Sequence, residues 1–157
     1  MSFEMTAIAH SQFTITRYLH RAVRRAFAAW SDPKAKRAWF VDHDGAEWET
    51  LSYDLDFRVG GREAGAFLKD GKVLHEIAIT FLDIMEERRI VFAYSMALDR
   101  VRHSASLATV ELTKTYSGCT LIYTEHGVYF AGSDGAAGRQ SGWEWLLSTL
   151  EKELEAR

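Results

Sequence analysis

The chain contains one cysteine, one proline and no asparagine among its 157 residues, and each shortage excludes something. The single cysteine, Cys119, cannot form a disulfide within the chain. Without asparagine there is no acceptor for N-linked glycosylation. A single cysteine favours a reducing compartment, so we expect a cytoplasmic protein.

Long apolar runs are also missing. No stretch approaches the roughly 20 apolar residues that a membrane-spanning helix needs. Residues 1–11 lack a long apolar run behind a basic start, so we expect no signal peptide. The formal net charge of −3 and the pI near 6.1 give no general attraction to nucleic acid or anionic lipid. We therefore predict neither a nucleic-acid partner nor a membrane partner.

Aromatic residues are abundant, whereas proline occurs only at Pro33. Phe, Trp and Tyr make up 13% of the chain. Aromatic residues are enriched in strands and proline is depleted from them, so this composition suits long, uninterrupted strands. The length fits one domain, and no repeat, linker or low-complexity tract divides the chain. We predict a single domain over residues 1–157.

The first part of the chain predicts one strand followed by two short helices. Residues 13–19 are rich in β-branched and aromatic residues, which is typical of a strand. Residues 21–30 change to helical spacing, with apolar side chains on one side and arginines on the other. Asp32 and Pro33 provide the cap and first turn of a second helix that reaches Phe40. Residues 42–50 are acidic and irregular and predict a loop.

The middle of the chain predicts an antiparallel meander. Apolar and polar residues alternate from residue 51, which places Leu51, Tyr53 and Leu55 on one apolar face of a strand. Gly60-Gly61 and Asp70-Gly71 indicate hairpin turns, because such turns need positive φ. Short turns connect antiparallel strands. Six strands are expected, over residues 51–58, 62–68, 73–84, 89–96, 102–114 and 119–130.

A long helix is predicted near the C-terminal end. Residues 131–138 are rich in small residues and predict a flexible loop. From about residue 139 to residue 155, an apolar face is formed by Trp143, Leu146, Leu147, Leu150 and Leu154. A sheet of this length twists and curls, and the helix needs an apolar surface to cover. We predict an α+β fold in which the sheet wraps the helix, and a cavity where the two do not meet.

Several local motifs occur in a characteristic order along residues 13–154. They are Val23 with Phe27, Ala29 and Trp30; Ser31-Asp32-Pro33; Trp39-Phe40; Asp56-Phe57-Arg58-Val59-Gly60-Gly61-Arg62; Arg88-Arg89-Ile90-Val91-Phe92; Thr124-Glu125-His126-Gly127; and Gly142-Trp143 with Leu146, Leu147 and Leu150. Together they resemble the family homologous to the C-terminal domain of the activator of heat-shock protein ninety ATPase.

This family is a branch of the START-like (SRPBCC) superfamily, which also includes the birch-pollen allergen and polyketide cyclases. The resemblance implies a helix-grip fold, in which a curved antiparallel sheet wraps a long C-terminal helix and two short helices follow the first strand. It does not fix the function, because the fold hosts ligand carriers, cyclases and chaperone partners.

The histidines do not have the spacing of metal ligands. No His-x-His pair occurs, and no second histidine follows His75-Glu76 at residue 79, which excludes a zinc-protease helix. His75, His103 and His126 would meet only if their strands are neighbours. We predict surface or hydrogen-bonded histidines, no bound metal and no cofactor.

Glu125 is the carboxylate of greatest interest. It shares the strand parity of Leu121 and Tyr123, so an inward face would place it at the rim of the cavity. There it could bind a ligand hydroxyl or act as a general base. The alternative is a structural role, such as pairing with an arginine, and we favour it because buried carboxylates are usually paired.

Aromatic side chains and a few polar groups are candidates for the lining of the cavity. A mostly apolar pocket with a few convergent polar groups is the usual form of a ligand site, although the same side chains could simply pack the core. No catalytic residue is assigned. The predicted cavity residues are Trp39, Tyr53, His75, Ile77, Phe92, Tyr94, Tyr123, Glu125, Trp143 and Leu147.

Three functions remain in competition. The first is binding of a small apolar or amphipathic, lipophilic molecule between the sheet and the C-terminal helix. The second is a polyketide cyclase/dehydratase-like enzyme, whose acid and base would come from Glu125, Tyr53, Tyr94 or His75. The third is a chaperone ATPase-associated protein-interaction module, ranked last because the resemblance is to one domain of a larger protein. Trp48 and Trp145 lie at positions expected to be exposed, which would allow a homodimer.

Overall fold

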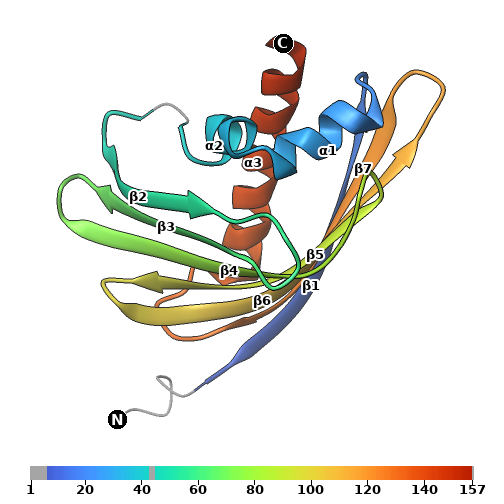
Figure 1. Cartoon of the computed structure of the whole chain (residues 1–157). Helices are drawn as coiled ribbons and strands as arrows, with labels where there is room; N and C mark the ends of the chain where they lie inside the picture. The colour runs from blue at the N-terminus through green and yellow to red at the C-terminus, as the bar shows by residue number, and fades with distance from the viewer. Residues whose placement is uncertain (1–6, 43–44, 157) are drawn as a thin grey trace.

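The computed structural model describes residues 7–42 and 45–156. A curved antiparallel sheet surrounds one long helix, and two short helices lie beside that helix at one end (Figure 1). The strands are β1 (Ala9–Leu19), β2 (Trp48–Leu55), β3 (Arg62–Lys69), β4 (Val73–Met85), β5 (Arg89–Leu98), β6 (Val101–Lys114) and β7 (Cys119–Tyr129). The helices are α1 (Val23–Ser31), α2 (Pro33–Phe40) and α3 (Gly135–Ala156).

The sheet has the strand order β1-β7-β6-β5-β4-β3-β2, and each neighbouring pair is antiparallel. Strands β2 to β7 form the predicted six-stranded meander. β1 pairs with β7, from Ala9 opposite Tyr129 to Leu19 opposite Cys119. The pair α1 and α2 therefore connects the two edges of the sheet. The predicted α+β helix-grip fold is confirmed.

Local sequence signals account for the second helix and for one of the hairpins. The side chain of Asp32 accepts a hydrogen bond from the backbone N–H of Ala35 at 3.2 Å, and Pro33 occupies the first helical position of α2. Between β3 and β4, Asp70 and Gly71 have φ angles of 54° and 65°. Two successive positive φ angles match the twist of the flanking strands, which is why an Asp-Gly pair occupies this turn.

Aromatic side chains fill the space between the helices and the concave face of the sheet. Trp30 of α1 packs edge-to-face against Trp39 of α2, with ring centroids 4.8 Å apart. Trp143 of α3 stacks on Tyr123 of β7 at 4.2 Å. The indole N–H of Trp39 donates to the carbonyl of Ala29 at 2.7 Å, so this buried ring keeps a hydrogen bond.

One prediction for the apolar face of β2 is wrong. Leu51 was expected to face the core, but it is 52% exposed. Thr50 pairs with Phe67 and Ser52 pairs with the adjacent Ala66, so Leu51 is the extra residue of a β-bulge. The bulge shifts the alternation of inward and outward side chains by one residue. Tyr53 and Leu55, after the bulge, therefore face the core as predicted.

The starts of three elements also differ from the prediction by three or more residues. β1 begins at Ala9, before residue 13, because its pairing with β7 extends beyond the apolar pattern. β2 begins at Trp48, inside the predicted loop 42–50, of which residues 43 and 44 lie outside the described residues. α3 begins at Gly135, within the predicted loop 131–138, where the Ser133 hydroxyl accepts a hydrogen bond from the N–H of Gly135 at 3.0 Å.

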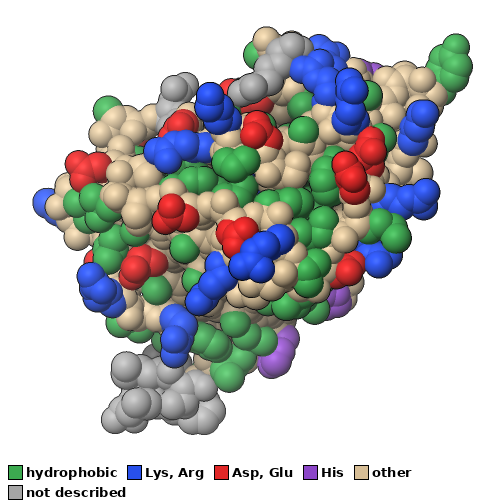
Figure 2. All heavy atoms as spheres, viewed as in Figure 1, with side chains coloured by type: hydrophobic (Ala, Val, Ile, Leu, Met, Phe, Trp, Pro, Cys, Tyr) green, Lys and Arg blue, Asp and Glu red, His purple; other side chains and the backbone are tan. Residues whose placement is uncertain are grey.

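The surface carries both signs of charge. On the face shown in Figure 2, lysine and arginine side chains are interspersed with aspartate and glutamate, and hydrophobic side chains lie between them. Such a mixed face agrees with the small net charge of −3. No helix among the described residues is long and apolar enough to cross a membrane.

A buried ion pair fixes α2 to the sheet. The ammonium group of Lys36, 2% exposed, lies 2.9 Å from a carboxylate oxygen of Glu63 on β3, which is 1% exposed. The Tyr53 hydroxyl donates to the other carboxylate oxygen. Lys36 also lies over the ring of Phe40, 4.3 Å from its centroid. Burial lowers the pKa of Lys36, and the charge of Glu63 opposes that effect.

We expect Lys36→Met to destabilise the protein strongly, because it leaves the carboxylate of Glu63 buried without its cation. Breaking one side of a buried pair costs about 3–5 kcal/mol. Urea denaturation of the variant measures this loss. Lys72→Met, at an exposed lysine, is the matched control and should change the free energy of unfolding by less than about 0.5 kcal/mol. Equal losses in the two variants would contradict the proposed role of the pair.

Candidate functional site

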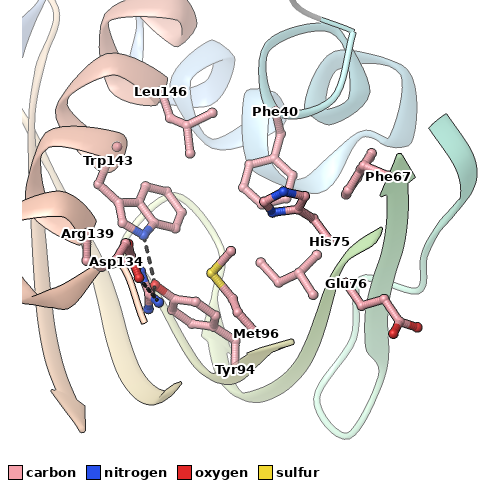
Figure 3. A pocket seen from close by; sticks show the side chains of 12 residues that line it. Phe40, Phe67, His75, Glu76, Tyr94, Met96, Asp134, Arg139, Trp143 and Leu146 are labelled. Carbon is pink, nitrogen blue, oxygen red and sulfur yellow. Dashed lines mark hydrogen bonds and ion pairs between the residues drawn. The ribbon is translucent and has the colours of Figure 1, made fainter. Parts of the chain in front are cut away.

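A pocket of about 210 Å³ lies between α3 and the concave face of the sheet (Figure 3). Five elements, α2, β3, β4, β5 and α3, contribute residues to it, together with Asp134 just before α3. Its lining is mostly apolar and is formed by Phe40, Phe67, His75, Glu76, Ile77, Tyr94, Met96, Asp134, Arg139, Gly142, Trp143 and Leu146. For comparison, an engineered apolar cavity of about 150 Å³ binds benzene, so the space suits one ring or a short alkyl chain.

The secondary structure explains which side chains face the pocket. On β4, His75 and Ile77 share the inward parity of the buried Ile79. Their neighbour Glu76 belongs to the opposite parity, and Figure 3 shows its carboxylate directed away from the pocket. On α3, Leu146 follows Trp143 by three residues and lies on the same side of the helix.

Arg139 is the main polar group at the helix side of the pocket, although it is only 3% exposed. Its Nε and one terminal nitrogen donate to the two oxygens of Asp134, each at 3.0 Å. That terminal nitrogen also donates to Ser104 Oγ at 2.6 Å. The other terminal nitrogen donates to the hydroxyl oxygen of Tyr94 at 3.1 Å and to Ser106 Oγ at 3.4 Å. A guanidinium has five N–H donors, so these bonds use all of them.

The hydroxyl of Tyr94 connects Arg139 to Glu125. It accepts from Arg139 and, at 3.0 Å, from the indole N–H of Trp143, so its own hydrogen goes to Glu125 Oε1 at 2.7 Å. The hydroxyl of Tyr123 donates to the same oxygen at 2.6 Å. Glu125 is 0% exposed, and its Oε2 lies 3.6 Å from Arg139. This is the pairing with an arginine that the sequence analysis favoured for Glu125.

The protonation states of these groups follow from their surroundings. Burial, with the charge of Glu125, raises the pKa of Tyr94 and of Tyr123, so both hydroxyls remain donors at neutral pH. Burial alone would raise the pKa of Asp134, but its hydrogen bonds with Arg139 lower the pKa overall. Burial likewise opposes the charge of Arg139, but the oxygens of Tyr94 and Asp134 outweigh it and raise the pKa. Asp134 and Arg139 therefore form an ion pair.

His75 is the polar group on the opposite side of the pocket (Figure 3). Its ring packs edge-to-face against Trp48, with centroids 4.9 Å apart, and it makes no hydrogen bond with the described residues. Burial, and secondarily the charge of Lys69, lower the pKa of His75. The imidazole is therefore neutral at pH 7 and offers one donor and one acceptor.

The structure brings some of the predicted cavity residues to the pocket and leaves others outside it. His75, Ile77, Tyr94 and Trp143 line it. The other six predicted residues do not line it. Trp39, Phe92 and Leu147 pack in the core. Tyr53 bonds the buried Glu63, and Tyr123 and Glu125 belong to the hydrogen-bond network of Tyr94.

Sequence reasoning missed Arg139 and Asp134. A signal for Arg139 was present, because it lies four residues before Trp143 on the apolar face of α3, where an arginine needs an internal partner. Asp134 gave no such signal, since it belongs to a stretch that was predicted to be a loop. His75, His103 and His126 do not form a metal site, and no group of three potential metal ligands occurs among the described residues.

The fold and the pocket together define a helix-grip protein of the START-like class. A family model described as "Activator of Hsp90 ATPase homolog 1-like protein" matches residues 21–155. The chain belongs to this family, as the motifs in its sequence indicated.

Solved structures agree with this assignment. A protein from Rhizobium leguminosarum is 39% identical, with 96% of this chain and 98% of that chain covered and a TM-score of 0.89. The Mll3558 protein from Rhizobium loti is 42% identical, with 94% and 99% covered and a TM-score of 0.85. The AHSA1-like protein from Aeromonas hydrophila is 21% identical, with 93% of each chain covered and a TM-score of 0.66, and it shows the fold alone. No curated protein sequence matches the chain.

We expect the histidine beside this network, His103, to make stability depend on pH. It is 6% exposed, its Nδ1 has no hydrogen-bond partner among the described residues, and burial and the charge of Arg139 lower its pKa, against a smaller opposing effect of Asp134. Below the ordinary value of 6.5, the unfolded chain therefore binds a proton more readily than the folded protein. Stability is fully present above that pH and falls as the solution becomes more acidic.

The test compares the free energy of unfolding at about pH 7 and about pH 5 in wild type and His103→Gln. The variant should lose less stability between the two values, and His75 contributes part of the remaining loss in the same direction. His20→Gln, at an exposed histidine, should behave as wild type. An unchanged pH dependence in His103→Gln would show that His103 is not the source.

Proposed function

We propose that the protein binds a small apolar or amphipathic molecule in the pocket between α3 and the sheet. The observation that carries this proposal is the pocket itself, about 210 Å³ of partly open space beside a closely packed aromatic core. Apolar side chains surround the body of the space, and the polar groups of His75, Asp134 and Arg139 lie at its sides. This combination is the usual form of a small-molecule site.

The size of the pocket limits the ligand. Sites for drug-sized molecules occupy about 300–1,000 Å³, so this pocket suits a smaller guest. A single ring or a short alkyl chain with one polar group would fill it. Phe40, Phe67 and Trp143 offer ring faces and edges for such a guest.

An enzymatic role has less support than binding. A cyclase or dehydratase needs an acid and a base that reach the substrate. Glu125 is fully buried and engaged by two tyrosine hydroxyls, and Tyr94 already makes three hydrogen bonds. Of the four groups named from the sequence, His75 is the remaining candidate base at the pocket, and no acid among the described residues is bonded to it.

Gly142→Leu should abolish ligand binding without unfolding the protein. Gly142 lines the pocket, and a Cβ at this position would meet no heavy atom within 4 Å, so a longer side chain can occupy the space. Glycine inside a helix costs roughly 1 kcal/mol relative to good helix formers, so the thermal midpoint should rise. Binding is measured by titrating benzyl alcohol and n-hexanol while following the indole N–H resonance of Trp143.

Gly142→Ala is the matched control for this experiment. It provides the same gain in helix propensity but adds only one methyl group, so binding should persist. Wild-type affinity in Gly142→Leu would place the ligand elsewhere and overturn the proposal.

The cytoplasmic location and the homodimer stay predictions. For the homodimer, Trp145 on α3 is 51% exposed, and Trp48 is half-buried against His75. Aromatic side chains at a surface favour association. Size-exclusion chromatography with light scattering should show a dimer mass at high concentration, and a strictly monomeric peak would end the idea.

A further inference from the structure

The polar side of the pocket has an unusual property for a site that contains an arginine. All five N–H donors of Arg139 are used inside the protein, by Asp134, Tyr94, Ser104 and Ser106. A ligand carboxylate would therefore find no free N–H on this guanidinium. The guanidinium of Arg139 binds groups of the protein itself, and the bidentate carboxylate of Asp134 already balances its charge.

Asp134, in contrast, keeps capacity for a ligand. A carboxylate has about four acceptor sites. Its Oδ1 accepts from Arg139 and from the Ser133 hydroxyl, and its Oδ2 accepts from Arg139. The side chain is 39% exposed and lines the pocket, so a ligand in the pocket can approach this carboxylate.

The charged groups around Asp134 are also negative on balance. Two carboxylates, Asp134 and Glu125, lie within 3.6 Å of the single guanidinium of Arg139. Glu125 Oε2 accepts no hydrogen bond from the described residues. Across the pocket His75 is neutral at pH 7, and the positive charge at that end belongs to Lys69, which lowers the pKa of His75. Beside Asp134, an anionic group would meet two carboxylates and no free N–H donor of Arg139.

We propose that the ligand of this pocket carries a neutral or cationic hydrogen-bond-donating group, an alcohol, a phenol or an amine, which binds Asp134, and that the site discriminates against carboxylates. This inference rests on the proposed function, because it concerns the same pocket. It names the chemical class that the pocket accepts and assigns Asp134 as the residue that determines specificity.

The experiment uses three probes that share one ring: benzyl alcohol, benzylamine and benzoate, with toluene as the apolar reference. Dissociation constants are measured on the wild-type protein by following the indole N–H resonance of Trp143, which bonds Tyr94 at the pocket. Benzyl alcohol and benzylamine should bind at least about tenfold more tightly than benzoate, since unfavourable charge contacts cost several kcal/mol. Benzoate binding as tightly as benzylamine would overturn the inference.

Asp134→Asn gives the reciprocal test. It removes one acceptor oxygen from Arg139 and supplies an amide donor, so benzylamine should bind more weakly and benzoate more tightly than in wild type. Asp54→Asn makes the same charge change at an exposed position on β2 and should leave both affinities unchanged. Parallel changes in both variants would mean that net charge, and not Asp134, sets the preference.

The outcomes separate this inference from the proposed function. If none of the four compounds binds wild type, the binding function itself fails. If toluene and benzoate bind while the alcohol and amine show no advantage, the pocket is a ligand site but the assignment of Asp134 is wrong. Because the wild-type series stands alone, loss of folding in Asp134→Asn would not remove the test.

Discussion

The buried guanidinium of Arg139 is the interaction on which the position of the long helix depends. Arg139 lies in the first turns of α3 and bonds serine hydroxyls of β6 and a tyrosine of β5. The bonds point in several directions from one planar group, so the helix can neither slide nor rotate without breaking some of them. Apolar contacts alone would tolerate small shifts of this kind, because they are not directional.

The pocket follows from this constraint. With the start of α3 held by Arg139, Trp143 stacks on Tyr123 one turn later and donates to Tyr94. Leu147 and Leu150 continue the buried face toward the C-terminal end of the helix. Leu146, between Trp143 and Leu147 in the sequence, lines the pocket together with side chains of β4 and β5. The space is thus set by the curvature of the sheet against α3, which Arg139 holds near its start and Arg17 and Arg21 hold toward its end.

Much of the fold could be predicted from periodicity, since the six strands from β2 to β7 each present a clear alternation or an apolar run between turn residues. Leu51 shows where that reasoning fails. A bulge shifts parity by one residue, and no local pattern distinguishes a bulged leucine from an inward one. The start of α3 was missed for a related reason, because hydrogen bonds of Ser133 and Asp134 order a glycine-rich segment that composition alone describes as flexible.

The candidate site was only partly accessible from the sequence. His75, Ile77, Tyr94 and Trp143 were found because strand and helix parity point them inward. The same rule also selected Trp39, Phe92 and Leu147, which are core residues. Parity identifies the inner face, but it cannot tell which inward residues meet a neighbour and which meet a gap. That difference depends on how far apart the helix and the sheet lie at each level, which is a property of the tertiary structure.

Two buried ionic networks, one at α2 and one at α3, differ in what they leave free. In the first, Lys36 and Glu63 have their charges matched one to one, with Tyr53 completing the carboxylate. In the second, two carboxylates share one arginine, and one of them, Asp134, reaches the pocket. Buried ion pairs are costly to desolvate and add little net stability, so their contribution here is to specify where α2 and α3 sit. Asp134 serves that task through its two bonds with Arg139, and it also keeps acceptor capacity beside the pocket, which the proposed ligand would use.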